Sequence, residues 1–287
     1  MIDESDTDYE PVSPDIKSEE SIQLVKLPTD KEHVSFSEIR DWHDCSYRHK
    51  LKQVKKIDLS KPGPLADFGT AVHAAAEHFL RTRIMDVTIA HTKLHKLWEV
   101  NHAFKGYEPA NLPNYMTQAA AVLTELPQWL EETFPGWEFV DAEHFLYETL
   151  PNHPHAFKGY IDAIITAPGP KDKKLTWLID WKTTSWGWSL EKKSNPMIKN
   201  QLIFYKNFWC KKTMTNLKDV RCAFVLLKRT APEGKRCELL QVSVGDVTTS
   251  RALKVLNNMI VSVKRGIALK NRSSCQYCDY KDTEHCT

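Results

Sequence analysis

The pattern of apolar and polar positions divides most of the chain into helix-like and strand-like segments. Five segments carry apolar residues at helical spacing: 65–83, 87–102, 114–134, 196–209 and 249–268. Five others are rich in branched and aromatic residues, which favours strands: 139–149, 160–166, 175–183, 221–228 and 236–245. Their order along the chain predicts a single α/β domain with a mixed central β-sheet flanked by helices.

The domain is expected to begin near residue 34. Ser35 and Glu38 have the spacing of a capping box, which predicts a helix start, and Phe36, Ile39 and Trp42 give that helix an apolar face. Residues 1–33 are acidic and show little periodicity, which predicts a disordered tail. Residues 34–287 would then form one domain, with residues 81–135 as a helical insertion.

Residues 157–182 predict a β-hairpin around a turn rich in proline, glycine and lysine at 168–174. If the hairpin is centred on Lys171, Asp162 faces Asp180, and Lys182 projects from the same face as Asp180. Facing side chains have Cβ atoms ~5 Å apart, so the two carboxylates repel unless a cation lies between them. The pattern indicates a metal-dependent hydrolytic centre. An exposed hairpin edge with ordinary surface charges is the alternative, and a slip of one residue in register would separate the pair.

Other candidate site residues lie on the neighbouring segments. His73 and Glu77 are one helical turn apart beside an apolar stripe, where a histidine is more often a core residue than a ligand. Gln201 and Tyr205 are also one turn apart, and Glu143 lies on the strand at 139–149. The tryptophans and lysines of 185–196 would either stack on bases and hold phosphates or form a hydrophobic lid.

Composition and charge narrow the class of protein. The chain has 287 residues, of which 41% are hydrophobic and 26% charged, as in ordinary soluble domains. No segment resembles a signal peptide or is apolar enough to span a bilayer, so we expect a cytoplasmic protein of a prokaryote, or of a virus in its host's cytoplasm, without membrane contact. The net charge is +2, but residues 1–30 carry −7, which leaves +9 on the rest. A basic body suits a polyanionic partner, although a generally solvated surface would have the same balance.

Seven cysteines in a protein expected to be cytoplasmic favour metal or redox chemistry over disulfides. Cys210, Cys222 and Cys237 fall in regular elements and are predicted to fill the core. The other four lie outside such elements.

Cys275, Cys278 and Cys286 close the chain, and the Cys-x2-Cys spacing suits a metal. Cys45, or alternatively His285, would supply a fourth ligand. Four thiolates suit an iron–sulfur cluster or a structural zinc ion, so residues 270–287 with Cys45 predict a C-terminal, cysteine-bound metal staple. The alternative is a set of free thiols on a frayed tail.

Taken together, these motifs resemble the RecB-like branch of the PD-(D/E)XK nucleases, in particular the compact type with a four-cysteine iron–sulfur cluster that occurs in CRISPR-associated RecB-like exonucleases and AddB-type helicase–nucleases. The resemblance extends from Ser35 to Cys286. It is carried by five pieces in order: Gly69-x3-His73, Gly159-Tyr160-Ile161-Asp162, Ile179-Asp180-Trp181-Lys182-Thr183, Gln201-x3-Tyr205 and the cysteine frame. The chain departs from the family in the longer gap before Cys286, and its second acid is Asp rather than Glu.

The resemblance implies a restriction-endonuclease-like core and a role for each matching residue. His73, Asp162, Asp180 and the main-chain carbonyl of Trp181 would hold Mg²⁺ or Mn²⁺. Lys182 would orient or activate the attacking water, while Gln201 and Tyr205 would brace the site and contact the DNA backbone. Glu143 and Glu77 are further candidates. Cys45, Cys275, Cys278 and Cys286 would hold a [4Fe–4S] cluster, with structural Zn²⁺ as the alternative.

The function expected from these features is hydrolysis of DNA by a metal-dependent nuclease. The resemblance favours an exonuclease acting on single-stranded ends in recombination, repair or replication. Because the sequence has no Walker A motif, any unwinding would come from a helicase or recombination partner. The alternative is a non-catalytic nucleic-acid-binding module or a zinc-stapled structural subunit of a DNA-processing complex.

Overall fold

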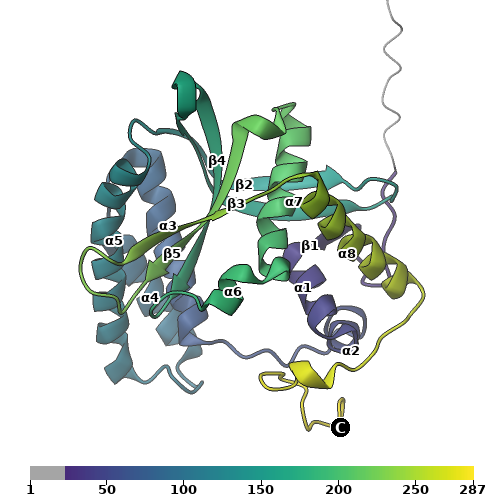
Figure 1. Ribbon diagram of the computed structural model, residues 1–287. Coiled ribbons are helices and arrows are strands. Elements are labelled where there is room, and N and C mark those ends of the chain that lie inside the picture. The colour runs from purple at the N-terminus through teal and green to yellow at the C-terminus, as the bar shows by residue number, and fades with distance from the viewer. Residues whose placement is uncertain (1–22) are drawn as a thin grey trace, which may run out of the picture.

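The computed structural model describes residues 23–287, which form a mixed β-sheet with helices on both faces (Figure 1). The strands of the sheet are β1 (His33–Ser35), β2 (Glu138–Thr149), β3 (Ala156–Pro168), β4 (Lys174–Thr184), β5 (Val220–Lys228) and β6 (Cys237–Val242). The α-helices are α1 (Phe36–Asp44), α2 (Ser46–His49), α3 (Pro64–Thr82), α4 (Val87–Asn101), α5 (Leu112–Thr133), α6 (Leu190–Ser194), α7 (Pro196–Thr213) and α8 (Asp246–Lys264). This arrangement confirms the α/β class predicted from the apolar pattern.

Strand β3 organises the sheet because it pairs with three other strands. One of its edges pairs antiparallel with β2 along almost the whole strand. Its other edge pairs first in parallel with β1, as far as Lys158, and then antiparallel with β4, from Ala163 onward. Residues 159–162 therefore lie on an edge of β3 between two partner strands. Beyond β4 the sheet continues with β5 in parallel and β6 antiparallel.

The β3–β4 hairpin has the register expected from the sequence. Ala163 pairs with Ile179, which centres the hairpin on Lys171 and places Asp162 and Asp180 one step beyond this pair. Lys171 has a left-handed backbone with φ of 59°, as the tight connection requires. Apolar residues on both strands fix this register, because a shift by one residue would turn them toward solvent.

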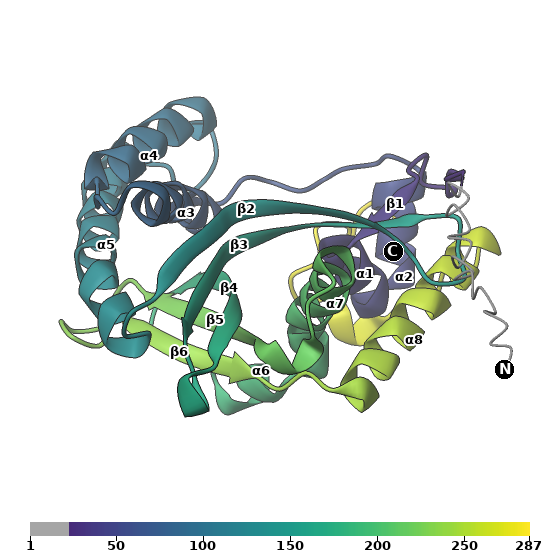
Figure 2. The same cartoon turned by 90° about the horizontal axis from the view of Figure 1, so that it is seen from above.

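Two hydrophobic clusters hold the helices against the sheet. Helices α3, α4 and α5 cover one face, where Phe68, Val72 and Leu123 are buried with Ala163 and Ile179 of the sheet. Helices α7 and α8, together with α1, cover the other face (Figure 2). Helices α4 and α5 lie within residues 81–135, where a helical insertion was expected, and they pack on α3.

The start of the domain differs from its expected boundary. Residues 1–22 of the predicted tail lie outside the described residues. Within the remainder of that segment, Leu27 is 3% exposed and Thr29 is fully buried. The Val25 amide also donates a hydrogen bond to the Pro154 carbonyl at 2.8 Å. The folded domain therefore includes residues that acidic composition assigned to the tail, because buried side chains and main-chain hydrogen bonds hold them there.

The predicted capping box is only half formed. The Glu38 amide donates to Ser35 Oγ at 3.3 Å and begins α1. The Glu38 carboxylate instead lies 3.1 Å from His49 Nε2 and 3.4 Å from Lys31 Nζ. Burial explains the difference, because Glu38 is 2% exposed and a buried carboxylate requires charged or hydrogen-bonding partners.

Among the helices of residues 23–287, none is both long and apolar enough to cross a lipid bilayer.

Candidate active site

Three potential metal ligands converge at the open edge of β3. His73 of α3, Glu143 of β2 and Asp162 of β3 each offer a ligand atom, and these atoms lie within 4.8 Å of one another. The Nδ1 atom of His73 is 3.6 Å from Asp162 Oδ2. Two carboxylates and an imidazole provide the oxygen and nitrogen donors that suit Mg²⁺ or Mn²⁺.

A glycine allows α3 to bring His73 over the sheet. A Cβ atom added at Gly69 would lie 3.1 Å from Thr183 Oγ1 on β4, which is tighter than most real contacts. The helix therefore approaches β4 closely at this point. His73 follows one turn later and projects from the same side of the helix, toward Asp162.

Glu143 reaches the site through an unusual backbone conformation. Its φ is 51°, a left-handed conformation that costs an L-residue about 1–2 kcal/mol. The neighbouring pairs, Ala142 with Ala163 and His144 with Ile161, place Glu143 opposite Asp162. Such strain is retained where the surrounding structure holds it and is concentrated at functional sites. The structure therefore gives Glu143 a more central place than the sequence did.

Asp180 lies beside this trio but is held by other side chains. Its Oδ1 atom accepts a hydrogen bond from Gln201 Nε2 at 2.6 Å, and its Oδ2 atom is 2.5 Å from Lys182 Nζ. Oδ2 is buried, and the Lys182 ammonium is the cation beside it in this structure. A metal ion at this oxygen would share it with the lysine.

The electrostatics of the trio favour a bound cation. Burial, together with the charge of Asp180, raises the pKa of Asp162 well above its ordinary value, and burial and Glu77 raise the pKa of Glu143. Burial lowers the pKa of His73, which favours the neutral imidazole that metals bind. Crowded acids beside a neutral histidine fit a divalent ion, because its charge offsets the repulsion among the carboxylates.

The main chain of β4 and two side chains of α7 also contact the candidate site. The Trp181 amide donates to Asp162 Oδ2 at 2.7 Å, and the Trp181 main chain also lies beside His73. On α7, Gln201 Nε2 is 3.1 Å from the hydroxyl of Tyr205, which is 5% exposed. A Cβ atom at Gly159 would lie 2.7 Å from Tyr205 Cε1, so the glycine admits the tyrosine ring against β3.

A polar groove leads to these residues. It is lined by His33, Ser35, Phe36, Ser37, Arg40, Lys158, Gly159, Tyr160, Asp162, Lys182, Gln201 and Tyr205. Among residues 23–287, neither Arg40 nor Lys158 forms an ion pair with a carboxylate. Their charges are therefore available to an anion in the groove. Sequence patterns did not single them out, because the two residues are brought together by the parallel pairing of β1 with β3.

Other predicted site residues lie farther from the trio or serve other contacts. Glu77 pairs with Arg81, with Oε1 and Nε 3.0 Å apart, although its charge reaches Glu143. In the loop before α6, Trp186 is 70% exposed, whereas Trp188 packs on Phe224 and lies under Lys192 of α6.

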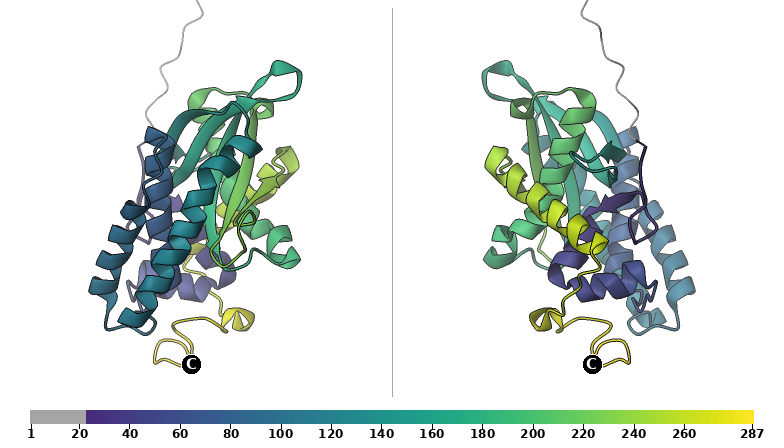
Figure 3. Two further views of the ribbon diagram at one scale, coloured as in Figure 1. Left: turned by 90° about the vertical axis from the view of Figure 1, so that its left-hand side faces the viewer. Right: turned by 90° about the vertical axis from the view of Figure 1, so that its right-hand side faces the viewer.

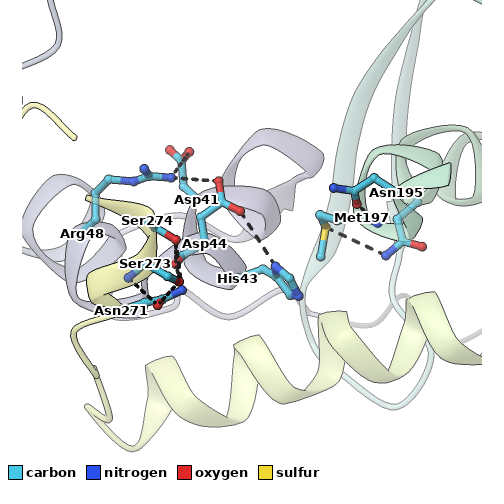
Figure 4. A network of polar contacts seen from close by, with 10 residues as sticks. Asp41, His43, Asp44, Arg48, Asn195, Met197, Asn271, Ser273 and Ser274 are labelled. Carbon is cyan, nitrogen blue, oxygen red and sulfur yellow. Dashed lines mark hydrogen bonds and ion pairs between the residues drawn. The ribbon is translucent and has the colours of Figure 1, made fainter. Parts of the chain in front are cut away.

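Cys45 contacts Leu269 and Asn271 of the C-terminal segment. Figure 3 shows this segment in yellow beside the purple N-terminal helices. Cys45 is buried between α1 and α2, and its sulfur accepts hydrogen bonds from the amides of Arg48 and Asn271 at 3.5 and 3.4 Å. The Asn271 side chain donates to the Asp44 carbonyl at 2.8 Å, as does the hydroxyl of Ser274 (Figure 4). These contacts connect α1 with the segment that carries the last three cysteines.

The sulfurs do not adopt the compact geometry of a mononuclear site. Sulfurs ~2.3 Å from a tetrahedral zinc ion lie about 3.8 Å from one another. In the part of the chain that the structure describes, no three of the cysteine sulfurs lie within 4.8 Å of one another. Cys210 and Cys222 are core residues as predicted, and burial raises the pKa of Cys210 to about 11 and that of Cys222 to about 12. Cys237 is only partly buried.

The acids, the histidine and the lysine meet where one edge of β3 changes its partner from β1 to β4. Such a cluster on an α/β fold suits a metal-dependent hydrolase. Residues 33–283 match the family model of the PD-(D/E)XK nuclease superfamily, and the chain belongs to this superfamily. Its members generally use Mg²⁺ or Mn²⁺, which is consistent with the donor set described above.

One solved structure supports this fold. The chain is similar to a crystal structure named "Putative exonuclease" from Eubacterium rectale, with a TM-score of 0.53 and 14% identity, over 87% of this chain and 88% of that chain. It also matches the crystal structure of SSO0001, with a TM-score of 0.33 and 13% identity, over 74% of this chain and 82% of that chain. No curated protein matches the sequence.

Proposed function

We propose that the protein is a metal-dependent deoxyribonuclease, which acts as an exonuclease on single-stranded DNA ends. The observation that carries this proposal is the convergence of His73, Glu143 and Asp162 at the end of a groove with unpaired basic residues. Membership of a nuclease superfamily and the exonuclease name of the similar crystal structure support it. Opening of a duplex would then be the task of a helicase or recombination protein.

His73, Glu143 and Asp162 would hold the divalent ion, with Asp180 and the main-chain carbonyl of Trp181 as further ligands. A bound Mg²⁺ or Mn²⁺ would supply charge neutralisation for the phosphodiester and a more acidic water. The charge of Asp180 acts on Asp162 and on His73, which supports its place in this set.

The remaining residues orient the reacting groups. Lys182 Nζ lies beside Asp180 and lines the groove, so it would hold the attacking water and offset negative charge on the phosphate. Gln201 fixes Asp180 and contacts the Tyr205 hydroxyl. Arg40 and Lys158 would contact backbone phosphates, as lysines and arginines do in most DNA complexes.

End-labelled DNA tests the proposal. The wild-type protein should shorten single-stranded DNA from one end with Mg²⁺ or Mn²⁺ and leave it intact with EDTA. Asp162→Asn should abolish cleavage while the circular dichroism spectrum stays that of the wild type. Absence of metal-dependent cleavage of single-stranded and double-stranded DNA would overturn the proposal and favour a non-catalytic binding module.

We also propose that Cys45, Cys275, Cys278 and Cys286 hold a [4Fe–4S] cluster that staples the chain ends. Two amide donors on the Cys45 sulfur suit a thiolate ligand, because such hydrogen bonds tune cluster sulfurs. Protein purified without oxygen should contain iron and sulfide and be brown, and Cys45→Ser should lose both. Stoichiometric zinc without iron would contradict the cluster.

A further inference from the structure

Strands β1, β2 and β3 carry a row of aromatic side chains that ends beside the candidate metal ligands. The row consists of His33, Tyr147, Phe145 and Tyr160, whose successive ring centroids are 5.7, 5.9 and 5.2 Å apart. We call these four residues the aromatic row. Phe145 faces Tyr160 across the two strands, and Tyr147 faces Lys158. Figure 2 shows this two-stranded ribbon extending from the α3–α5 helices to β1.

Two residues of the aromatic row, those nearest the candidate metal ligands, are exposed, whereas His33 and Tyr147 are partly buried. Phe145 is 43% exposed and Tyr160 is 46% exposed. Exposed aromatic rings gathered on one face mark a binding surface more often than rings that are scattered singly. The exposed rings therefore suit a ligand with flat apolar faces that can stack on them.

Basic residues near the aromatic row indicate which class of ligand it binds. Lys158 lines the groove beside Tyr160 and forms no ion pair among residues 23–287. Lys212 Nζ donates to the Phe145 carbonyl at 3.3 Å and lies 3.6 Å from Glu148. Arg40 faces the same groove from α1. Aromatic rings beside basic side chains suit a single nucleic acid strand, because its bases stack on the rings and its phosphates contact the cations.

The position of Tyr160 connects the row to the reacting centre. Tyr160 precedes Asp162 by two residues, so both side chains project from the same side of β3, about 7 Å apart along the strand. Both residues line the groove. A base stacked on Tyr160 would thus be next to the phosphate that the site holds. A blunt duplex offers no such base, because its bases are already stacked on one another.

We propose that the aromatic row is a stacking platform that holds the unpaired bases of a DNA strand and so gives the enzyme its preference for single strands. This inference rests on the proposed nuclease function and assigns Phe145 and Tyr160 as specificity-determining residues. The platform binds bases of any sequence, because every base has a π face.

Binding of fluorescent oligothymidylate and of a blunt duplex, measured by anisotropy without divalent ions, tests the platform. Phe145→Ala and Tyr160→Ala should each weaken single-strand binding by roughly 5- to 100-fold, the range of base–aromatic stacking. Tyr160→Phe should bind as the wild type does, because it keeps the ring. Phe104→Ala is the matched control, since Phe104 is 41% exposed on the α4–α5 connection. Duplex binding should change in none of them.

Several outcomes separate this inference from the proposed function. If the wild type cleaves DNA but Tyr160→Ala binds the single strand as tightly as the wild type, the platform is wrong and the nuclease assignment stands. An equal loss of duplex and single-strand binding would also overturn base stacking. A wild type that binds RNA of the same sequence more tightly than DNA would overturn the choice of DNA. If the wild type cleaves no DNA at all, the proposed function fails, whatever the variants bind.

Discussion

Gln201 holds Asp180 through a hydrogen bond of 2.6 Å from its Nε2 atom to Asp180 Oδ1. The bond joins α7 to β4 and fixes the carboxylate whose other oxygen lies against Lys182. Because the same amide contacts Tyr205, one side chain determines the orientation of two site residues. Positioning groups of this kind behind metal ligands are typically as important as some ligands themselves.

We expect Gln201→Ala to lower the rate of DNA cleavage by about 10- to 100-fold, the usual effect of removing such a support. Cleavage should require a higher metal concentration, because Asp180 would be free to rotate. A Mn²⁺ titration of the cleavage rate measures both effects. Gln128→Ala is the matched control, since Gln128 of α5 makes a comparable amide contact to Glu132 at 2.8 Å on the surface. Equal rates for the two variants would contradict the role of Gln201.

Lys182→Ala should reduce cleavage by about 100- to 10,000-fold, the range of general acid–base contributions, and leave the fold intact. Lys182 is partly exposed in the groove, so its removal leaves no large cavity. Single-turnover rates at saturating metal test this expectation. Lys174→Ala provides the control on the same strand, because Lys174 pairs with Glu138 at the surface. A Lys182→Ala rate equal to the wild type would show that another group activates the water.

Replacement of Glu143 should separate stability from activity. Both Glu143→Gly and Glu143→Ala should lose metal binding. The glycine variant should unfold with a free energy roughly 0.5–1 kcal/mol higher than the alanine variant, because glycine relieves the left-handed strain but is more flexible when unfolded. Urea unfolding in EDTA and Mn²⁺ calorimetry measure the two effects. Equal stabilities would indicate that the backbone relaxes in the alanine variant.

Acidification should destabilise the folded domain through the buried side chain of His155. His155 is fully buried, and its Nδ1 atom is 2.7 Å from the Val25 carbonyl. Burial lowers its pKa below 6.5, so the unfolded chain binds more protons at this site once the pH falls below that value. The folded state then loses stability as the pH decreases through and below 6.5.

Urea unfolding in EDTA at about pH 7.5 and about pH 5.5 checks this window. His155→Asn keeps a donor for the Val25 carbonyl but cannot titrate, so its free energy of unfolding should fall less between the two pH values than that of the wild type. His102→Asn is the control, because exposed His102 makes a similar Nδ1 contact to the Glu99 carbonyl. An unchanged pH dependence in His155→Asn would assign the loss of stability to other groups.

The sequence was sufficient to predict the hairpin that carries Asp162, Asp180 and Lys182. Its apolar strands and its polar turn allow one favourable register, and the structure has that register. The local apolar pattern was also sufficient to predict the long helices, because their apolar residues repeat over several turns.

The rest depended on contacts between distant segments. β1 has only three residues and pairs with β3 more than a hundred positions later, so no local pattern marks it. The sequence named Glu143 only as a further candidate, because no propensity predicts a left-handed glutamate within a strand. The capping box was incomplete because His49 lies close enough to bind the Glu38 carboxylate.

The central position of β3 in the sheet also determines when the candidate active site can be completed during synthesis of the chain. Helices α3, α4 and α5 contact one another over short stretches of chain, so they can pack as soon as they leave the ribosome. Val34 of β1 has no partner until Phe157 emerges, and Asp180 and Gln201 follow later still. A chain that stops between residues 163 and 179 therefore contains His73, Glu143 and Asp162 but lacks Asp180, Lys182 and Gln201. Premature termination products of this gene would consequently lack the groups that the catalytic proposal requires.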